Sequence, residues 1–565
     1  MRAVQPRPAR GRAAVQTVPG LLAARASADP AGVALTVHGV GSLTFGEWYR
    51  RSDDAARGLL ERGLRPGDRV GLVFGESEWI DYAIAYCAAQ KAGGVAVPLS
   101  GGLPPGELDR LLAHSSATCA VHGAGRSVAG EGLWTVTLAE LTARDGEGTA
   151  ALGGTAALGG AAAVSEPVGL GGTVGLGEPV GLGRVTVEGE VAGDGGEVGS
   201  RAYTGCGVPV RPGDPAQILY TSGTTGEPKG VVASHANLTY GCSPDARHRP
   251  LAHSRHFLHA FPIGTNAAQT MLINSLDARP GALTLPRFTP ARFGRLIESY
   301  GVGTVFLVPS MAIELLNAGV AEKHDLSSVL LLGSTAAALA PAVATALTKA
   351  FPRATIVNYY TSTEAAPAQT TMVFDPARPD SVGRPASGGA LMISDGLRPV
   401  PPGTAGEVWL RSPAAPRGYD GDRDAPGQVF RDGWVRMGDI GYLDEDGYLY
   451  LLDRESDIVK SGAFKISTLR IEAALHEHPA VVDAAVFGIP HPVMGSAVAA
   501  GVVCRSETSP VELRAFLSGR LAGHELPTRW LILPSLPKNA AGKVLKRELR
   551  TILATPEGDD AADSP

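Results

Sequence analysis

The segment TSGTTGEPKG, from Thr221 to Gly230, follows the apolar stretch AQILY at 216–220 and decides how the rest of the chain is interpreted. Glycines let the backbone bring its N–H groups close to an anion, hydroxyls add donors, and Lys229 adds a positive charge. A loop of this kind directly after a buried strand is typical of a phosphate site. It is not a P-loop, because two further residues separate Gly226 from Lys229. The plain alternative is a solvent-exposed Gly/Ser/Thr linker.

Apolar strands and amphipathic helices alternate on both sides of this loop. Strands are expected at 69–74, 94–99, near 120, and at 217–220, 302–309 and 354–360, with helices at 105–114 and 341–351 among them. This order predicts an α/β fold with two doubly wound sheets. Beyond about Arg384, shorter strands with turn residues predict a small antiparallel β subdomain. The segment after Asp453 predicts a small, mobile α+β domain.

The domain boundaries follow from these changes in the pattern of strands, helices and turns. We expect a disordered basic N-terminus at 1–16, an N-terminal domain at 17–453, a C-terminal domain at 454–550 and an acidic tail at 551–565. Between about 146 and 200 the composition changes to Gly, Ala, Val and Glu, and EPVGLG occurs twice. Ordering so many glycines costs backbone entropy, so we expect a flexible insertion.

Composition narrows the function classes. Fifty Lys and Arg against 56 Asp and Glu give a formal net charge of −6, which argues against nucleic acid as a partner. The apolar runs are too short to span a membrane, and the N-terminus lacks the apolar core of a signal peptide, so we expect a cytoplasmic protein. The five Cys form no C-x-x-C pair, which argues against a disulfide scaffold and against a structural zinc site.

Five segments together resemble the adenylate-forming superfamily of AMP-dependent synthetases and ligases, which comprises acyl-CoA synthetases, luciferases and peptide-synthetase adenylation domains. TSGTTGEPKG resembles its phosphate loop. The others occur in the family's order: GSTAAALAP from Gly333, NYYTSTE at 358–364, GDIGYLDEDGYLYLLDR at 438–454 and PKNAAGK at 537–543. The resemblance covers roughly 17–550 outside the insertion. It implies a large AMP-binding domain and a small AMP-binding C-terminal domain.

The resemblance also implies roles for individual residues. Glu364 would bind Mg²⁺, Tyr360 would offer a face to adenine, and Asp439 would accept hydrogen bonds from the ribose. Arg454 would follow the ribose and α-phosphate. The catalytic residues implied are Lys543, Glu364, Thr225 and Lys229. The nucleotide-binding residues implied are Thr221, Ser222, Gly223, Thr224, Thr225, Gly226, Lys229, Thr335, Ala336, Tyr359, Tyr360, Thr361, Thr363, Glu364, Asp439, Arg454 and Lys543.

The implied reaction uses ATP and Mg²⁺. A carboxylate attacks the α-phosphorus, Lys543 reaches the α-phosphate and the acid, and a thiol then displaces AMP after the small domain rotates. The thiol would belong to CoA or to the phosphopantetheine arm of an acyl carrier protein. The implied hinge is Ser456, where the family usually has Asp or Lys.

The expected acid pocket consists of Phe261, Gly264, Thr265, Asn266, Val308 and Ser334. Its polar members favour a small or aromatic acid with a polar substituent over a long-chain fatty acid. Thr335 and Thr361 replace family glycines, which narrows the space. Pro262 stands where amino-acid-activating domains have an Asp, so amino acids are disfavoured as substrates.

Two other functions remain open at this stage. One is an adenylating enzyme of secondary metabolism with a non-thiol acceptor, either forming amides or activating nitrite for diazotisation. The other is a non-catalytic nucleotide-binding relative. The sequence alone leaves undecided the identity of the acid, the acceptor, the oligomeric state and the role of the Gly-rich insertion.

Overall fold

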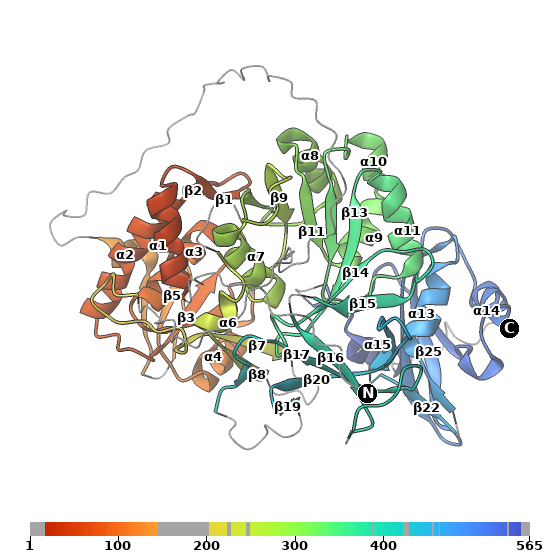
Figure 1. The fold of residues 1–565 in the computed structure, drawn as a ribbon. Helices are drawn as coiled ribbons and strands as arrows, with labels where there is room; N and C mark the ends of the chain where they lie inside the picture. The colour runs from red at the N-terminus through yellow and green to blue at the C-terminus, as the bar shows by residue number, and fades with distance from the viewer. Residues whose placement is uncertain are drawn as a thin grey trace, which may run out of the picture.

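The computed structural model describes residues 17–130, 132–143, 203–222, 228–243, 249–386, 388–396, 398–421, 429–454, 457–462, 464–539 and 542–554, with the backbone alone at Ser222. The expected N-terminal arm, the Gly-rich insertion, the centre of the phosphate loop and the hinge residue Ser456 therefore lie outside the described residues. Within these ranges the chain forms three sheets with helices around them (Figure 1).

The first sheet carries the phosphate loop. Its strands are, in spatial order, β18 (Gly418–Tyr419), β8 (Pro228–Ser234), β7 (Pro215–Ser222), β4 (Val95–Ser100), β3 (Arg69–Phe74), β5 (Ala117–His122) and β6 (Trp134–Thr137). The strands from β7 to β6 are parallel, whereas β8 and β18 run antiparallel to their neighbours. The antiparallel end differs from the expected doubly wound pattern because β7 and β8 form a hairpin around the loop.

Helices cover both faces of this sheet. α4 (Pro105–His114) packs on one face through Leu108, Leu111 and Leu112. α3 (Trp79–Lys91) packs on the other and also contacts β1 and β2 of the second sheet. Because α3 is enclosed between two sheets, it is buried on nearly all sides rather than amphipathic.

The second sheet has a parallel half and an antiparallel half. The parallel half consists of β1 (Val33–Val37), β10 (Gly281–Thr284), β9 (His256–His259), β11 (Thr304–Leu307), β12 (Leu331–Ser334) and β13 (Thr355–Tyr360), with β2 (Gly41–Thr44) antiparallel at the edge. Its helices are α7 (Asn266–Asp277), α8 (Pro290–Tyr300), α9 (Pro309–Asn317), α10 (Val320–Lys323) and α11 (Pro341–Ala350), and the chain start adds α1 (Val18–Ala28) and α2 (Phe45–Glu61). The short helices α5 (Leu138–Thr142) and α6 (His235–Leu238) follow β6 and β8.

The expected antiparallel β subdomain continues the second sheet without a break. Its strands are β14 (Thr370–Val373), β15 (Ser381–Pro385), β21 (Leu449–Arg454), β20 (Trp434–Leu443), β17 (Gly406–Arg411) and β16 (Ala390–Ser394), with β19 (Phe430–Arg431) beside β20. β14 pairs with β13, so the hairpin that carries Asp439 and Arg454 is held on the same sheet as Tyr360.

The C-terminal domain is a small α+β unit, drawn in blue in Figure 1. Its sheet contains β23 (Phe464–Ile466), β22 (Val459–Ser461), β25 (Gly495–Cys504), β24 (Val481–His491) and β26 (Arg529–Ile532). The helices are α13 (Thr468–His476), α14 (Pro510–Ser518), the 3₁₀ helix η2 (Gly523–Glu525) and α15 (Lys546–Ala554). α15 runs four residues past the expected domain end at 550, because Leu549 and Leu553 bury one of its faces.

This domain lies against the parallel half of the second sheet. α13 contacts α11, β24 contacts α9, and Arg505 Nη2 donates to Asn317 Oδ1 at 3.3 Å. Within the described residues no helix combines the length and apolarity that crossing a bilayer requires.

Candidate active site

The two strands that flank the phosphate loop are paired directly. Thr221 of β7 lies opposite Lys229 of β8, and the residues between them that the sequence assigns to phosphate binding, Gly223 to Gly226, lie outside the described residues. Lys229 Nζ lies 5.0 Å from the centre of the Tyr419 ring. Tyr419 belongs to β18, which pairs with β8, so its ring lies next to Lys229 on the neighbouring strand.

Thr363 and Glu364 follow the carboxyl end of β13, where ligands gather in open α/β sheets. Tyr419 donates its hydroxyl to Glu364 Oε1 at 3.2 Å. The Thr363 carbonyl accepts a hydrogen bond from Arg417 Nη1 at 2.9 Å. The structure thus places the implied metal ligand near Lys229, with Tyr419 between them.

Asp439 is the centre of a second polar group. It lies opposite Arg454 in the β20–β21 ladder, and Arg454 Nε lies 3.4 Å from its Oδ1. Tyr360 donates its hydroxyl to Asp439 Oδ2 at 2.5 Å. Burial raises the pKa of Asp439, and the Arg454 guanidinium opposes that rise. Asp439 therefore contacts two other residues that are expected to surround the nucleotide.

The other residues expected near the nucleotide differ in how they are placed. Thr335 is buried after β12, and Ala336 has a φ of +73°, a left-handed backbone rare for a residue with a side chain. Thr361 donates its hydroxyl to the Ala368 carbonyl at 2.7 Å. Tyr359 is only 1% exposed, since neighbouring strand residues face opposite sides. Its ring lies in the core, so the nucleotide contact predicted for Tyr359 would come from its backbone.

Lys543 reaches this group from the C-terminal domain. Its backbone N–H donates to Asn539 Oδ1 at 2.9 Å, and Gly542 before it has a φ of +78°. A Cβ atom placed on Gly542 would lie 2.8 Å from Ser310 Oγ and 3.2 Å from Val308 Cγ2. The loop therefore touches the strand end that the sequence assigns to the acid pocket.

The ammonium group of Lys543 is electrostatically perturbed although the residue is partly open to solvent. Desolvation, and to a smaller extent the Arg454 charge, lower its pKa to about 8, while Asp457 and Asp439 act in the opposite direction. A lysine held this way still carries its charge at neutral pH. It lies within electrostatic reach of Asp439 and Arg454.

This pKa predicts the pH dependence of adenylation. If the charged ammonium stabilises the transition state, kcat/KM for pyrophosphate release should fall as the pH rises through about 8, because deprotonation removes the charge. A pH profile of the wild-type chain and of Lys543→Ala checks this. A falling limb near pH 8 that persists in the alanine variant would assign the titration to another group.

The expected acid pocket is assembled from the ends of β9, β11 and β12. Phe261 is buried with its ring stacked on His259, at 5.7 Å between ring centres. Thr265 caps the N-terminus of α7 by accepting from the Ala268 N–H. Asn266 Oδ1 accepts from Arg417 Nη1 at 3.0 Å. Of the six predicted lining residues, Phe261, Thr265 and Asn266 thus have contacts within the fold itself.

Two buried polar atoms at this sheet edge have no hydrogen-bond partner within the described residues. They are Ser334 Oγ on β12 and Asn358 Oδ1 on β13, which are register partners on adjacent strands. Leaving a buried polar group unpaired costs about 1–3 kcal/mol, so these two neighbouring atoms are candidates for contact with a ligand. The sequence had singled out Ser334 but not Asn358.

Glu76 is a further polar residue that sequence reasoning missed. It follows β3, and its Oε2 accepts the Ile263 N–H at 3.0 Å while Ser100 Oγ lies 3.5 Å from Oε1. A Cβ atom placed on Gly264 would lie 3.4 Å from the Ser100 backbone nitrogen. Glu76 therefore joins the first sheet to the loop of the acid pocket. Its position after a buried strand was the signal that could have revealed it.

The environment of Glu76 predicts a pH-dependent stability. Burial raises its pKa from 4.5 to about 7, against the Ile263 and Ser100 hydrogen bonds. Because the folded pKa exceeds the unfolded one, its contribution to stability is full below about pH 4.5 and is lost as the pH rises to about 7. Glu76→Gln should therefore gain stability relative to the wild type between pH 5 and 8. Melting temperatures over that range measure it, and a constant difference between the two proteins would contradict the assignment.

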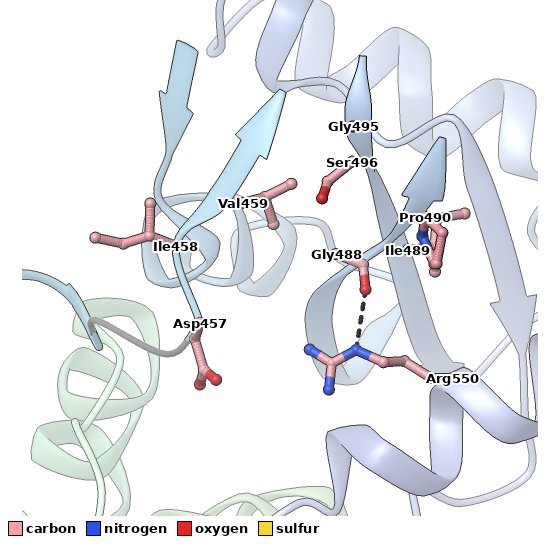
Figure 2. Close-up of a pocket in the computed structure, with 9 residues that line it drawn as sticks. All are labelled: Asp457, Ile458, Val459, Gly488, Ile489, Pro490, Gly495, Ser496 and Arg550. Atoms are coloured by element: carbon pink, nitrogen blue, oxygen red, sulfur yellow. Dashed lines mark hydrogen bonds between the residues drawn. The ribbon is translucent and has the colours of Figure 1, made fainter. Parts of the chain in front are cut away.

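A hollow of about 350 Å³ lies elsewhere, within the C-terminal domain (Figure 2). Its lining includes Asp457, Ser496 and Arg550, whose Nε donates to the Gly488 carbonyl at 2.9 Å. None of the predicted site residues lines it, so we assign the chemistry to the sheet edges described above.

Comparisons with known proteins agree with this geometry. The family model described as AMP-binding enzyme matches residues 22–420, and the model described as AMP-binding enzyme C-terminal domain matches 470–543. This chain belongs to the AMP-binding enzyme family. Feruloyl-CoA synthase from Amycolatopsis sp is 31% identical over 528 residues, covering 91% of this chain and 94% of the relative.

Further similarities extend this result. 2-Succinylbenzoate–CoA ligase from Bacillus cereus (strain Q1) is 31% identical, covering 60% of this chain and 70% of the relative. Among solved structures, the amide bond synthetase McbA from Marinactinospora thermotolerans superposes with a TM-score of 0.71 at 25% identity. The match covers 94% of this chain and 99% of that one. The acyl-CoA synthetase-like family assignment made from the five motifs is confirmed.

Proposed function

We propose that this enzyme adenylates a small or aromatic carboxylic acid with ATP and then transfers the acyl group to a thiol. The observation that carries the proposal is the position of Lys543. It comes from the C-terminal domain, lies within the electrostatic reach of Asp439 and Arg454, and follows Gly542, which contacts the wall of the acid pocket. This position supports the proposal that one cation acts on both expected substrates.

The residues present fit ATP and Mg²⁺. Asn358 and Tyr360 share one face of β13, and the unpaired Asn358 Oδ1 would accept from the amino group of an adenine lying against the Tyr360 ring. Mg²⁺ is usually held by one or two carboxylates together with phosphates. The single carboxylate of Glu364, close to Lys229, suits that arrangement, and the metal would supply neutralisation of the triphosphate charge.

The proposed first step joins the acid to AMP. A carboxylate oxygen of the acid attacks the α-phosphorus, a new P–O bond forms, and the bond to the oxygen that bridges to the β-phosphate breaks. Lys543 offsets the charge that develops at the α-phosphate and orients the attacking carboxylate. Lys229 and Thr225 would hold the departing pyrophosphate.

The proposed second step forms a thioester. A thiolate attacks the acyl carbonyl, the C–O bond to AMP breaks, and AMP leaves with that electron pair. The acceptor is CoA or a phosphopantetheine arm, and CoA is favoured because several relatives are named as CoA ligases or synthases. We place the hinge for the domain rotation at Ser456, two residues past Arg454.

An aromatic acid is favoured within this class. The names feruloyl-CoA synthase and 2-succinylbenzoate–CoA ligase refer to acids with an aromatic ring and a polar substituent. The predicted pocket combines the apolar ring of Phe261 with the polar side chains of Asn266 and Ser334. This combination suits a ring that carries a hydrogen-bonding group.

A panel of acids tests the proposal. Benzoates and cinnamates with hydroxyl, methoxy or amino groups, short aliphatic acids and nitrite are each incubated with ATP and Mg²⁺, with and without CoA. The proposal expects pyrophosphate release with an aromatic acid, which turns over repeatedly only when CoA is present and yields the acyl-CoA. Pyrophosphate release with nitrite as the one active substrate would count against the proposal. The absence of release with every acid in the panel would also count against it.

Amide formation is the second candidate, because a solved amide bond synthetase matches nearly the whole chain. The same panel separates it from thioester formation. If an acid gives a single turnover with CoA but many turnovers with an added amine, and the product is an amide, then the acceptor is nitrogen rather than sulfur.

A further inference from the structure

Arg417 is a buried cation whose acceptors come from three different segments. It is 8% exposed and precedes β18. Its Nε donates to Asn237 Oδ1 at 2.9 Å, and its Nη1 donates to Asn266 Oδ1 at 3.0 Å and to the Thr363 carbonyl at 2.9 Å. One planar guanidinium thus ties the acid-pocket wall to the residue before the implied metal ligand.

The charge of Arg417 is not balanced by a contacting carboxylate in the part of the chain that the structure describes. Each of the three acceptors is a neutral amide or carbonyl oxygen. Burial lowers its pKa to about 10, while the more distant Tyr86 and Glu364 act in the opposite direction. It therefore stays charged at neutral pH. Burying a charge costs free energy. Because all three acceptors are neutral, we interpret Arg417 as a residue that holds their segments in position.

Tyr419 acts on the same segment from β18, two residues after Arg417. Arg417 holds the Thr363 carbonyl, and the Tyr419 hydroxyl donates to Glu364 Oε1. The dipeptide 363–364 is therefore fixed at two points, one on its backbone and one on its carboxylate.

Asn237 braces both ends of this arrangement. Its Nδ2 donates to the Ala366 carbonyl at 3.1 Å and to the Ala415 carbonyl at 2.8 Å. Ala366 lies two residues after Glu364, and Ala415 lies two residues before Arg417. These two hydrogen bonds hold the segment that carries Glu364 and the segment that carries Arg417. Asn237 thus fixes the position of Arg417 relative to Glu364.

We propose that Arg417 and Tyr419 are positioning residues that fix Glu364 and Asn266 relative to one another, so that metal binding and acid binding are coupled through β18. This inference rests on the proposed function, and it adds to that function a physical link between the triphosphate end and the acid end of the site. Neither residue belongs to the five motifs from which the family was recognised.

The test compares Arg417→Met, Tyr419→Phe and Arg411→Met. The last is the matched control, because the Arg411 guanidinium lies over the Trp434 ring, 4.7 Å from its centre, in the β subdomain. Acid-dependent exchange of pyrophosphate into ATP is titrated with Mg²⁺ and with acid, and melting temperatures are recorded alongside. Arg417→Lys, which keeps the charge but not the fork, carries the test if Arg417→Met does not fold.

The two positioning residues should give different signatures. Arg417→Met raises both the half-saturating Mg²⁺ concentration and the acid KM by about 10-fold or more, since hydrogen bonds to charged groups contribute about 1.5–3 kcal/mol. Tyr419→Phe keeps the ring beside Lys229 and raises the Mg²⁺ requirement alone. Arg411→Met changes neither. A drop in kcat or melting temperature without these shifts would reduce Arg417 to a structural residue and overturn the inference.

Failure of the proposed function is distinguishable from failure of this inference. If the wild-type chain shows no acid-dependent exchange, the proposed reaction fails. Calorimetric titration of ATP at several Mg²⁺ concentrations then still reports whether Arg417→Lys and Tyr419→Phe weaken the metal-dependent part of ATP binding. Equal Mg²⁺ dependence in wild type and both variants would overturn the inference.

Discussion

Replacing Lys543 with alanine is expected to lower the rate of acyl-adenylate formation by roughly 10²–10³, the loss usual for one preorganised charge or donor aimed at a transition state. Lys543 is held for this task by its own loop: its N–H is bonded to Asn539, and Gly542 rests against Val308 and Ser310. Alanine removes the ammonium without disturbing that backbone, so the loss reports the charge.

The control lies in the same motif. Lys538 is paired with Asp483 inside the C-terminal domain at 2.8 Å, away from Asp439. Lys538→Ala should leave adenylation close to wild type, measured as acid-dependent pyrophosphate release. Thioester formation from supplied acyl-AMP should also change much less in Lys543→Ala than adenylation does. Wild-type rates of acyl-AMP formation in Lys543→Ala would contradict the assignment of Lys543 to adenylation.

Asp439→Asn is expected to raise the KM for ATP by about 10–100-fold, because hydrogen bonds to a charged acceptor contribute about 1.5–3 kcal/mol. Asp439 is buried, and its two oxygens already face Tyr360 and Arg454. A neutral amide of the same shape would remove the negative charge that interacts with the positive charges of Arg454 and Lys543. Since Asp439 raises the pKa of Lys543, the alkaline limb of the pH profile should also move below pH 8.

Asp446→Asn is the matched control for this prediction. Asp446 is in the turn of the same β20–β21 hairpin, where it pairs with Arg378 at the surface. Its substitution should change neither the KM for ATP nor the pH profile. Steady-state kinetics with ATP varied at saturating acid measures both. An unchanged KM in Asp439→Asn would remove the ribose role from Asp439.

The parts of the fold set by local pattern were predictable from sequence. The strand expected at 69–74 and the helix expected at 105–114 are β3 and α4 with the same bounds. The contact between Asp439, Arg454 and Tyr360 could be anticipated from motif resemblance. Local periodicity and motifs succeed here because each depends on residues close together in the chain.

Long-range placement was not predictable in the same way. β1, near the start of the chain, pairs with its neighbour β2 and with β10 of the second sheet, whereas the strands that follow, β3 to β5, belong to the first sheet. Arg417 precedes Gly418 and Tyr419 in a segment whose Pro, Gly and Asp content is typical of a surface loop. Its burial depends on Asn237, Asn266 and Thr363 meeting it from three other segments. No local signal carries that information.

The nucleotide product formed from ATP tests the central claim most directly. The wild-type chain, Mg²⁺, ATP and each aromatic acid of the panel are incubated, and the products are separated and identified by mass. We expect pyrophosphate only when an acid is present, matched by an equal amount of acyl-AMP without CoA and by acyl-AMP plus AMP together once CoA is added. ADP and phosphate, or AMP formed equally with and without every acid, would contradict the account.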